Sequence, residues 1–162
     1  MKQQDAIALL KADHKKVKGL FAEAEELSDR ATTQLKRLGD QICMELQVHT
    51  EIEETVFYPA VKERTQRGHK EERSMVLEAY EEHALAKTLV EELQNLEATE
   101  ETYKPKLKTL QELIEHHVKE EEREFFPATR EIIDEEQMVE LGRQMMEIKQ
   151  QRMGAETEEA EV

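Results

Sequence analysis

Residues 49–60 read His-Thr-Glu-Ile-Glu-Glu-Thr-Val-Phe-Tyr-Pro-Ala, and residues 117–128 read His-Val-Lys-Glu-Glu-Glu-Arg-Glu-Phe-Phe-Pro-Ala. The two stretches align without a gap and share the pattern H-x-x-x-E-E-x-x-F-[YF]-P-A. Each also follows a lone His that has an acidic neighbour: His14 lies 35 residues before the first stretch, and His83 lies 34 residues before the second. This internal repeat predicts two helical hairpins of one design, related by a pseudo-two-fold axis.

The repeated His and Glu are spaced for one face of a helix. Side chains at i and i+4 lie one turn apart on the same side, so each His can point to the same centre as its Glu. The lone His residues fall on apolar stripes whose members recur every three or four residues. All four helices are therefore predicted to aim an imidazole into the interior, and two of them add a carboxylate. The six residues are His14, His49, Glu53, His83, His117 and Glu121.

The remaining sequence fits an all-α fold. Charged residues make up 38% of the chain, there are only five Gly and three Pro, and helix-forming residues dominate. Four helical patterns cover about residues 5–27, 33–64, 71–97 and 105–130. Because the connections between them are short, consecutive helices should be antiparallel neighbours. We therefore predict an up-down-up-down four-helix bundle over residues 1–133.

A fifth pattern follows the bundle. Asp134 and Gln137 resemble a capping box, and Met138, Leu141 and Met145 then form an apolar stripe. This predicts an extra amphipathic C-terminal helix over residues 134–153, which packs either on the bundle or on a second copy of the chain, as a homo-oligomer would. Residues 154–162 are rich in Glu and are expected to be a disordered acidic tail.

Composition and charge exclude several function classes. The formal net charge of −15 argues against nucleic acid as a partner, since phosphate binding needs a basic surface. No apolar run is long enough to span a membrane, and the N-terminus lacks the pattern of a secretory signal. The single Cys43 excludes an internal disulfide and is interpreted as a small core residue. These features favour a cytoplasmic protein without a membrane association.

The six inward residues have a simple structural interpretation and a metal interpretation. A single His on an apolar stripe is usually a hydrogen-bonded core residue, and a single Glu often extends to the surface. Here that interpretation requires one interior His on each helix and two matched interior Glu. Unpaired buried carboxylates would cost several kcal/mol each, and a bound cation removes that cost. The pattern therefore favours a metal site.

The donor set indicates which metals fit and how many. Imidazole and carboxylate ligands without a thiolate suit Fe, Mn or Zn, and six ligands are too many for one structural zinc. Two octahedral ions offer twelve positions; four His, two bridging Glu and one oxo or hydroxo bridge leave about two of them open. Open positions bind exogenous ligands, so we expect a working centre. The Glu-x-x-His motif of ferritin-like di-iron proteins is absent from the sequence.

These residues resemble the hemerythrin family, in particular its bacterial HHE-type members. The resemblance rests on His14, the His49-x-x-x-Glu53 and His117-x-x-x-Glu121 pairs and His83, and it covers residues 5 to about 130. It implies a bundle that holds two oxo- or hydroxo-bridged iron ions, with Mn or Zn less favoured, and that reversibly binds dioxygen. The chain departs from the oxygen carriers at Lys87, where they place a fifth His.

The missing His leaves the function open. The first hypothesis is a carrier, sensor or scavenger that binds dioxygen or another small ligand such as nitric oxide. The alternatives are an enzyme that reduces peroxide or nitric oxide, and an iron-sensing or iron-centre repair protein. Tyr80, one turn before His83, is a candidate to fill the vacant ligand position or to donate to the ligand. The acidic neighbours of the six residues are interpreted as surface groups, with support of the ligands as the alternative: Asp13, Glu54, Glu82 and Glu122.

Overall fold

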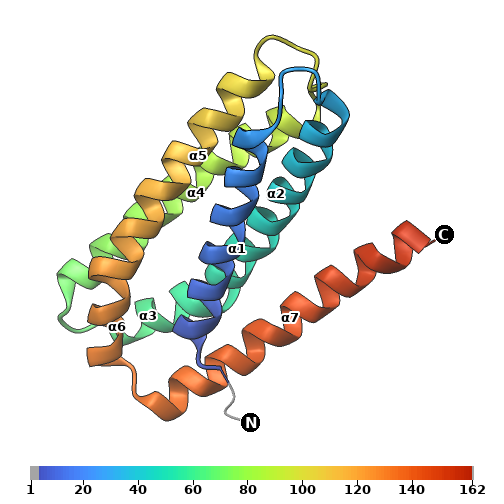
Figure 1. The fold of residues 1–162 in the computed structure, drawn as a ribbon. Coiled ribbons are helices and arrows are strands. Elements are labelled where there is room, and N and C mark those ends of the chain that lie inside the picture. Colours follow the sequence, from blue (N-terminus) through green and yellow to red (C-terminus); the bar gives the residue numbers. More distant parts are fainter. Residues whose placement is uncertain (1–3, 162) are drawn as a thin grey trace.

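The computed structural model describes residues 4–161, and the side chains of residues 4–154. Four long helices form the bundle (Figure 1). They are α1 (Ala6–Glu26), α2 (Thr32–Ile52), α4 (Lys70–Gln94) and α5 (Tyr103–Glu120). Helix α1 packs against α2, and α4 packs against α5, so the two sequence hairpins are the two halves of the bundle. The predicted all-α four-helix bundle with an extra C-terminal helix is confirmed.

The repeated motif produces the same irregularity twice. Regular α-helix stops at each ligand-type glutamate, and a π-helical turn follows: η1 is Glu53–Phe57 and η2 is Glu121–Phe125. The short helices α3 (Tyr58–Arg64) and α6 (Phe126–Ile132) then begin with a proline in their first turn. A proline inside a helix has no N–H to donate and crowds the preceding turn, so the wider turn accommodates Pro59 and Pro127. Such turns are frequent at functional sites.

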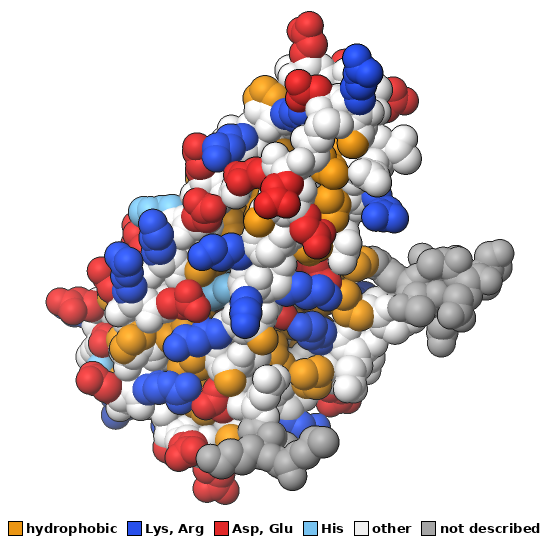
Figure 2. All heavy atoms as spheres, viewed as in Figure 1, with side chains coloured by type: hydrophobic (Ala, Val, Ile, Leu, Met, Phe, Trp, Pro, Cys, Tyr) orange, Lys and Arg blue, Asp and Glu red, His pale blue; other side chains and the backbone are white. Residues whose placement is uncertain are grey.

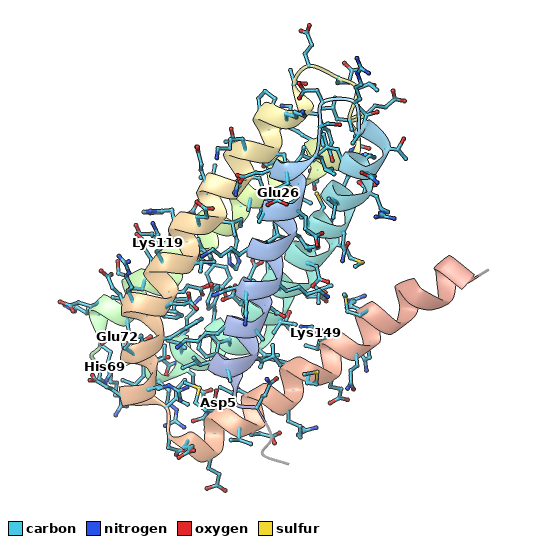
Figure 3. The ribbon with its side chains drawn as sticks, in the orientation of Figure 1. Asp5, Glu26, His69, Glu72, Lys119 and Lys149 are labelled. Atoms are coloured by element: carbon cyan, nitrogen blue, oxygen red, sulfur yellow. The ribbon has the colours of Figure 1, made fainter. Side chains whose placement is uncertain are left out.

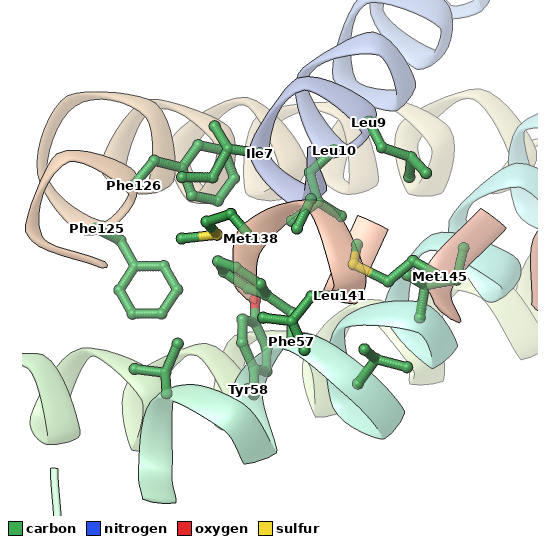
Figure 4. Close-up of a cluster of buried hydrophobic side chains, with 14 of the residues drawn as sticks. Ile7, Leu9, Leu10, Phe57, Tyr58, Phe125, Phe126, Met138, Leu141 and Met145 are labelled. Carbon is green, nitrogen blue, oxygen red and sulfur yellow. The ribbon is translucent and has the colours of Figure 1, made fainter. Parts of the chain in front are cut away.

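The apolar core is divided into two clusters along the bundle. One cluster surrounds Phe57, Phe125 and Met138 near the start of α1, and Figure 4 shows its aromatic and methionine side chains. The other surrounds Phe21, Ile42 and other residues near the opposite end. On every long helix the predicted ligand His lies in sequence between residues of the two clusters. The sequence thus places a polar layer across the middle of an otherwise apolar interior.

The last helix, α7 (Glu135–Glu161), packs on the bundle against α1, α2 and η1. Asp134 directly precedes the helix, and its side chain accepts a hydrogen bond from the Gln137 amide at 2.8 Å, as the capping-box prediction expected. Met138 and Met145 are buried against the bundle. A Cβ atom on Gly142 would lie 2.5 Å from the carbonyl oxygen of Gln4, so only glycine permits this close approach. The apolar stripe of α7 is used within the chain, and an oligomer through this helix stays a prediction.

The end of α7 differs from the sequence expectation. We expected helix over 134–153 and a disordered tail over 154–162, whereas the structure continues the helix to Glu161. Residues 155–161 contain only Ala, Glu and one Thr, and Ala and Glu are strong helix formers, so local propensity accounts for the extension. None of the helices in the described part of the chain is both long and apolar enough to cross a membrane.

Candidate metal centre

The structure brings all six sequence-predicted residues together in the polar layer. His14 comes from α1, His49 from α2, His83 from α4 and His117 from α5, while Glu53 and Glu121 open the two π-helical turns. Every one of them is buried, with His14 at 8% exposure and the other five between 0% and 5%. The two halves of the repeat therefore contribute equally to one interior cluster.

The four imidazoles form two pairs. The ring centroids of His14 and His49 lie 5.0 Å apart, and those of His83 and His117 lie 4.9 Å apart. Within each pair one His comes from a lone position and the other from a His-x-x-x-Glu motif. Each pair is thus an edge-to-face arrangement that can present two Nε2 atoms to a common point.

Both glutamates reach across the two pairs. Glu53 Oε1 lies 3.1 Å from His49 Nε2 and 3.2 Å from His83 Nε2. Glu121 Oε1 lies 3.2 Å from both His14 Nε2 and His117 Nε2. Each carboxylate therefore touches one imidazole of each pair, so the two pairs share both glutamates.

Several of these buried atoms have no hydrogen bond among the described residues. They include Nε2 of His14 and of His49 and both carboxylate oxygens of Glu53. Buried polar atoms in proteins nearly always form a hydrogen bond, and a buried atom without one costs free energy of folding. Two geometric triads of potential ligands also form within the layer: His14, His49 and Glu121, and Glu53, His83 and His117. The donor set fits a cation, which would satisfy these atoms.

A carboxylate faces the outer nitrogen of every imidazole. His49 Nδ1 lies 3.0 Å from Asp13, and His117 Nδ1 lies 3.2 Å from Glu82. These contacts hold the rings with Nε2 directed inward, which is the role carboxylates play behind metal-bound imidazoles. Glu54 lies 3.4 Å from His83 Nδ1, and Glu122 lies farther from His14 Nδ1, at 3.8 Å.

The interpretation of these four acids as surface groups is therefore wrong for Asp13 above all, which is 4% exposed. Its other oxygen contacts Lys149 from α7, a residue that Figure 3 shows between α7 and the bundle. Glu54 in turn forms a 2.7 Å ion pair with Lys87, the residue that stands where an oxygen carrier has its fifth His. The sequence repeat indicated a role for these acids, because each half has one acid directly before the lone His and another directly after the ligand-type glutamate.

Tyr80, the sequence candidate for the vacant ligand position, has its ring against another tyrosine, and a role for it at the site stays a prediction. Its ring packs edge-on against Tyr58 at 5.4 Å between centroids and lies under Lys62. The hydroxyl at the site belongs to Tyr58, which donates a 2.9 Å hydrogen bond to Glu121 Oε2. That hydroxyl also lies 3.3 Å from His83 Nε2 and 3.5 Å from His117 Nε2. The sequence signal for Tyr58 was weak: it is the one motif position where the repeats carry Tyr and Phe.

The charges of the metal-free cluster follow from its geometry. Burial disfavours a charged imidazole, but Glu53 and Asp13 outweigh burial and raise the pKa of His49 to about 10. Burial likewise opposes the charge on His117, yet Glu121 holds its pKa well above the ordinary value. Burial and the nearby carboxylates Glu121 and Glu53 raise the pKa of Tyr58, so its proton stays in place. Without a metal, protons on two imidazoles neutralise part of the carboxylate charge.

A small cavity adjoins the imidazoles. Its volume is about 20 Å³, and it has room for roughly one water-sized molecule. All four imidazoles line it, together with Val17, Leu46, Ile114 and Val118 and the polar residues Asp13 and Thr50. The space beside the imidazoles is therefore small and suits a very small ligand.

Comparisons with known proteins identify one domain family over most of the chain. The hemerythrin HHE cation-binding domain family matches residues 5–129. A crystal structure of a hemerythrin HHE cation-binding domain-containing protein from Mycobacterium kansasii superposes with a TM-score of 0.76 at 27% identity, covering 94% of this chain and 90% of that one. An uncharacterized hemerythrin-like protein of Schizosaccharomyces pombe is 27% identical over 129 residues, or 80% of this chain.

One further relative has a different name. A protein of Nostoc described as a DNA nickase is 29% identical over 159 residues, which is 96% of this chain. The present chain spans 42% of the length of the Nostoc protein and 61% of the length of the S. pombe protein. What those longer proteins do as a whole is thus not carried over to this chain by the match.

Proposed function

The chain belongs to the hemerythrin HHE cation-binding family, and we propose that its buried cluster binds two iron ions and, with them, dioxygen or another small ligand. His14 and His49 would hold one ion, His83 and His117 the other, and the two glutamates would be shared. The observation that carries this proposal is the reach of each glutamate to one imidazole of each pair, at 3.1–3.2 Å.

The donor chemistry supports iron. Imidazole and carboxylate groups suit Fe(II) and Fe(III), and the one thiol, that of Cys43, is buried in the apolar cluster with Phe21 and Ile42 rather than at the site. Bound iron would supply the electrons that reversible dioxygen binding requires. The cation-binding function is common to the family, whereas the identity and number of the ions are part of the proposal.

The protein's own groups would control what reaches the ions. The cavity of about 20 Å³ limits the ligand to a few atoms, and the side chains of Val17, Ile114 and Val118 shield it from bulk water. Asp13 and Glu82 keep the imidazole rings of His49 and His117 in position through their Nδ1 atoms. Tyr58 keeps a hydroxyl proton beside Glu121.

Metal analysis tests this proposal directly. Protein purified aerobically and loaded with Fe(II) should contain about two irons per chain and show near-ultraviolet charge-transfer bands that shift with azide. Glu53→Ala, which removes a shared ligand, should lose both the bands and the second iron. Glu78→Ala is a suitable control, since Glu78 is an exposed residue of α4. A chain that stays iron-free under loading, or binds a single inert ion, contradicts the proposal.

A second candidate function is reduction of peroxide at the same centre. The Tyr58 hydroxyl favours it, because a group 2.9 Å from Glu121 and beside two imidazoles can pass a proton to a ligand held there. Tyr58→Phe should then abolish peroxide turnover in the presence of a reductant while leaving the iron content and azide bands unchanged. Equal turnover by the variant and the parent protein would remove this candidate.

A further inference from the structure

Two surface depressions lie on opposite sides of the interior cavity. One, with a volume of about 480 Å³, lies between α1 and α5; the other, of about 380 Å³, lies between α2 and α4. The α1/α5 depression shares four lining residues with the cavity: His14, Val17, Ile114 and Val118. The α2/α4 depression shares Leu46 and Thr50 with it. The α1/α5 depression therefore reaches an imidazole directly, at His14, whereas the α2/α4 depression meets the cavity at Leu46 and Thr50.

The two depressions carry opposite charge. The α2/α4 depression is lined by Glu51, Glu54 and Glu91 and by a single cation, Lys87, which is already paired with Glu54. The α1/α5 depression is lined by four lysines and two glutamates. They are Lys11, Lys15, Lys18 and Lys119, with Glu115 and Glu122.

The lysines of the α1/α5 depression are not engaged in structural ion pairs. Lys11, Lys15 and Lys18 follow one another at i, i+4 and i+7 along α1, and Lys119 faces them from α5. Within the described side chains none of the four has a hydrogen bond or a salt bridge. Figure 2 views this side of the molecule and shows Lys and Arg side chains gathered over α1 and α5, and Figure 3 labels Lys119.

The placement of these lysines matters because the chain as a whole repels anions. With a net charge of −15, the protein disfavours the approach of a negatively charged ligand over most of its surface. A local group of unpaired cations reverses that field, and a concave wall of low polarity strengthens it. His14 forms the floor of the depression and is the most exposed of the six site residues.

We propose that the α1/α5 depression is the access route to the metal centre and that it selects small anions of the size of azide, nitrite or hydroperoxide. The inference rests on the proposed function, since it supplies the ligand class for the same centre. The anion collects at the lysines and passes between Val17, Ile114 and Val118 to reach the cavity beside His14. The acidic α2/α4 depression does not admit it.

Stopped-flow binding of azide to the iron-loaded protein tests this route. The variant replaces Lys11, Lys15 and Lys18 with Gln, and the matched control replaces Lys104, Lys106 and Lys108 with Gln. The control makes the same change in net charge on lysines of α5 that lie about 14–20 Å from His117 along the helix and that form surface ion pairs with Asp29, Glu92 and Glu25. The first variant should bind azide about tenfold more slowly at low ionic strength, and the difference should shrink in high salt.

Three further measurements separate the alternatives. Nitric oxide, a neutral probe, should bind the reduced centre at the same rate in all variants, and the triple Lys→Arg variant at positions 11, 15 and 18 should keep the parent azide rate. Equal azide rates in the two Gln variants, or an equal slowing of azide and nitric oxide, would overturn the inference. Iron content and helical circular dichroism are measured first on every variant. A parent protein that takes up no iron overturns both the proposed function and the inference. Normal iron content with azide rates unchanged in the Lys→Gln variant overturns only the inference.

Discussion

Asp13 connects the candidate metal centre to the last helix, and this gives a prediction with two separable readouts. One oxygen of Asp13 accepts a hydrogen bond from His49 Nδ1 at 3.0 Å, and the other contacts Lys149 of α7. Burial alone would raise the pKa of Asp13, but His49 and Lys149 outweigh it and hold that pKa below its ordinary value, so the side chain is ionised. Replacing Asp13 with Asn keeps the shape and removes the charge.

The first expected effect is on metal binding. Loss of a carboxylate behind a metal-bound imidazole typically lowers metal affinity about 10–100-fold, which corresponds to roughly 1.4–2.7 kcal/mol. Glu82→Gln is the matched control, because Glu82 supports His117 at the pseudo-equivalent position of the other half, at 3.2 Å. Both variants should lose iron to a competing chelator at similar, lower chelator concentrations than the parent protein.

The second expected effect distinguishes the two variants. Only Asp13 also holds Lys149, which is partly exposed, so the loss of that ion pair should cost about 1 kcal/mol or less. Amide hydrogen exchange in the middle of α7 should become up to about fivefold faster in Asp13→Asn and stay unchanged in Glu82→Gln. Parent-like iron retention in both variants would refute the supporting role of the carboxylates, and unchanged α7 exchange would refute the link through Lys149.

Four other predictions follow from the site and the packing. The pKa of His49 is raised from 6.5 to about 10, so its positive charge stabilises the metal-free chain fully below pH 6.5, and that stabilisation is lost as the pH rises through 10. Urea unfolding at several pH values measures this dependence, and a free energy of unfolding that does not change with pH contradicts it. Iron binding must displace that proton, so apparent iron affinity should increase over the same window, as chelator competition would show. Gly142→Ala should destabilise the protein by roughly 1–3 kcal/mol, because its Cβ would meet the Gln4 carbonyl, and calorimetry measures the shift against Gly19→Ala, where the Cβ meets nothing. Removing bound metal with a chelator should lower Tm by roughly 5–10 °C if the ion was present at about 100 times its Kd.

The bundle and the six site residues could be predicted because the sequence contains the same hairpin pattern twice. A single His on an apolar stripe carries little information, but the same His-x-x-x-Glu spacing in two hairpins, each with a lone His one helix earlier, leaves few other arrangements. The interior direction of His49 and Glu53 follows from regular helical periodicity, which holds up to the glutamate itself. The acids behind the imidazoles were misjudged because a residue next to an inward-facing His, such as Asp13, normally points partly toward solvent; here α7 covers it.

Tyr58 was missed because the backbone leaves regular helical geometry just before it. In a continuous α-helix, Tyr58 would point about 140° away from Glu53, since five residues at about 100° each separate them. The π-helical turn Glu53–Phe57 adds roughly one residue per turn and so removes about 100° of that angle. The tyrosine is thereby brought to the side of the site, and Tyr80, favoured by regular periodicity, packs behind it.

The same turn occurs in the second half, and there the equivalent residue is Phe126. Its ring stacks on His14 with centroids 5.9 Å apart and an interplanar angle of 8°, whereas Tyr58 stands beside His83 and His117 with its hydroxyl on Glu121. One imidazole pair is therefore covered by an apolar ring, next to the lysine-lined depression, and the other faces a proton donor. Although the six proposed ligands are nearly symmetric, this difference makes the two halves of the centre inequivalent: a ligand that arrives at the His14 side lies next to an apolar ring, and the Tyr58 hydroxyl lies beside the other imidazole pair.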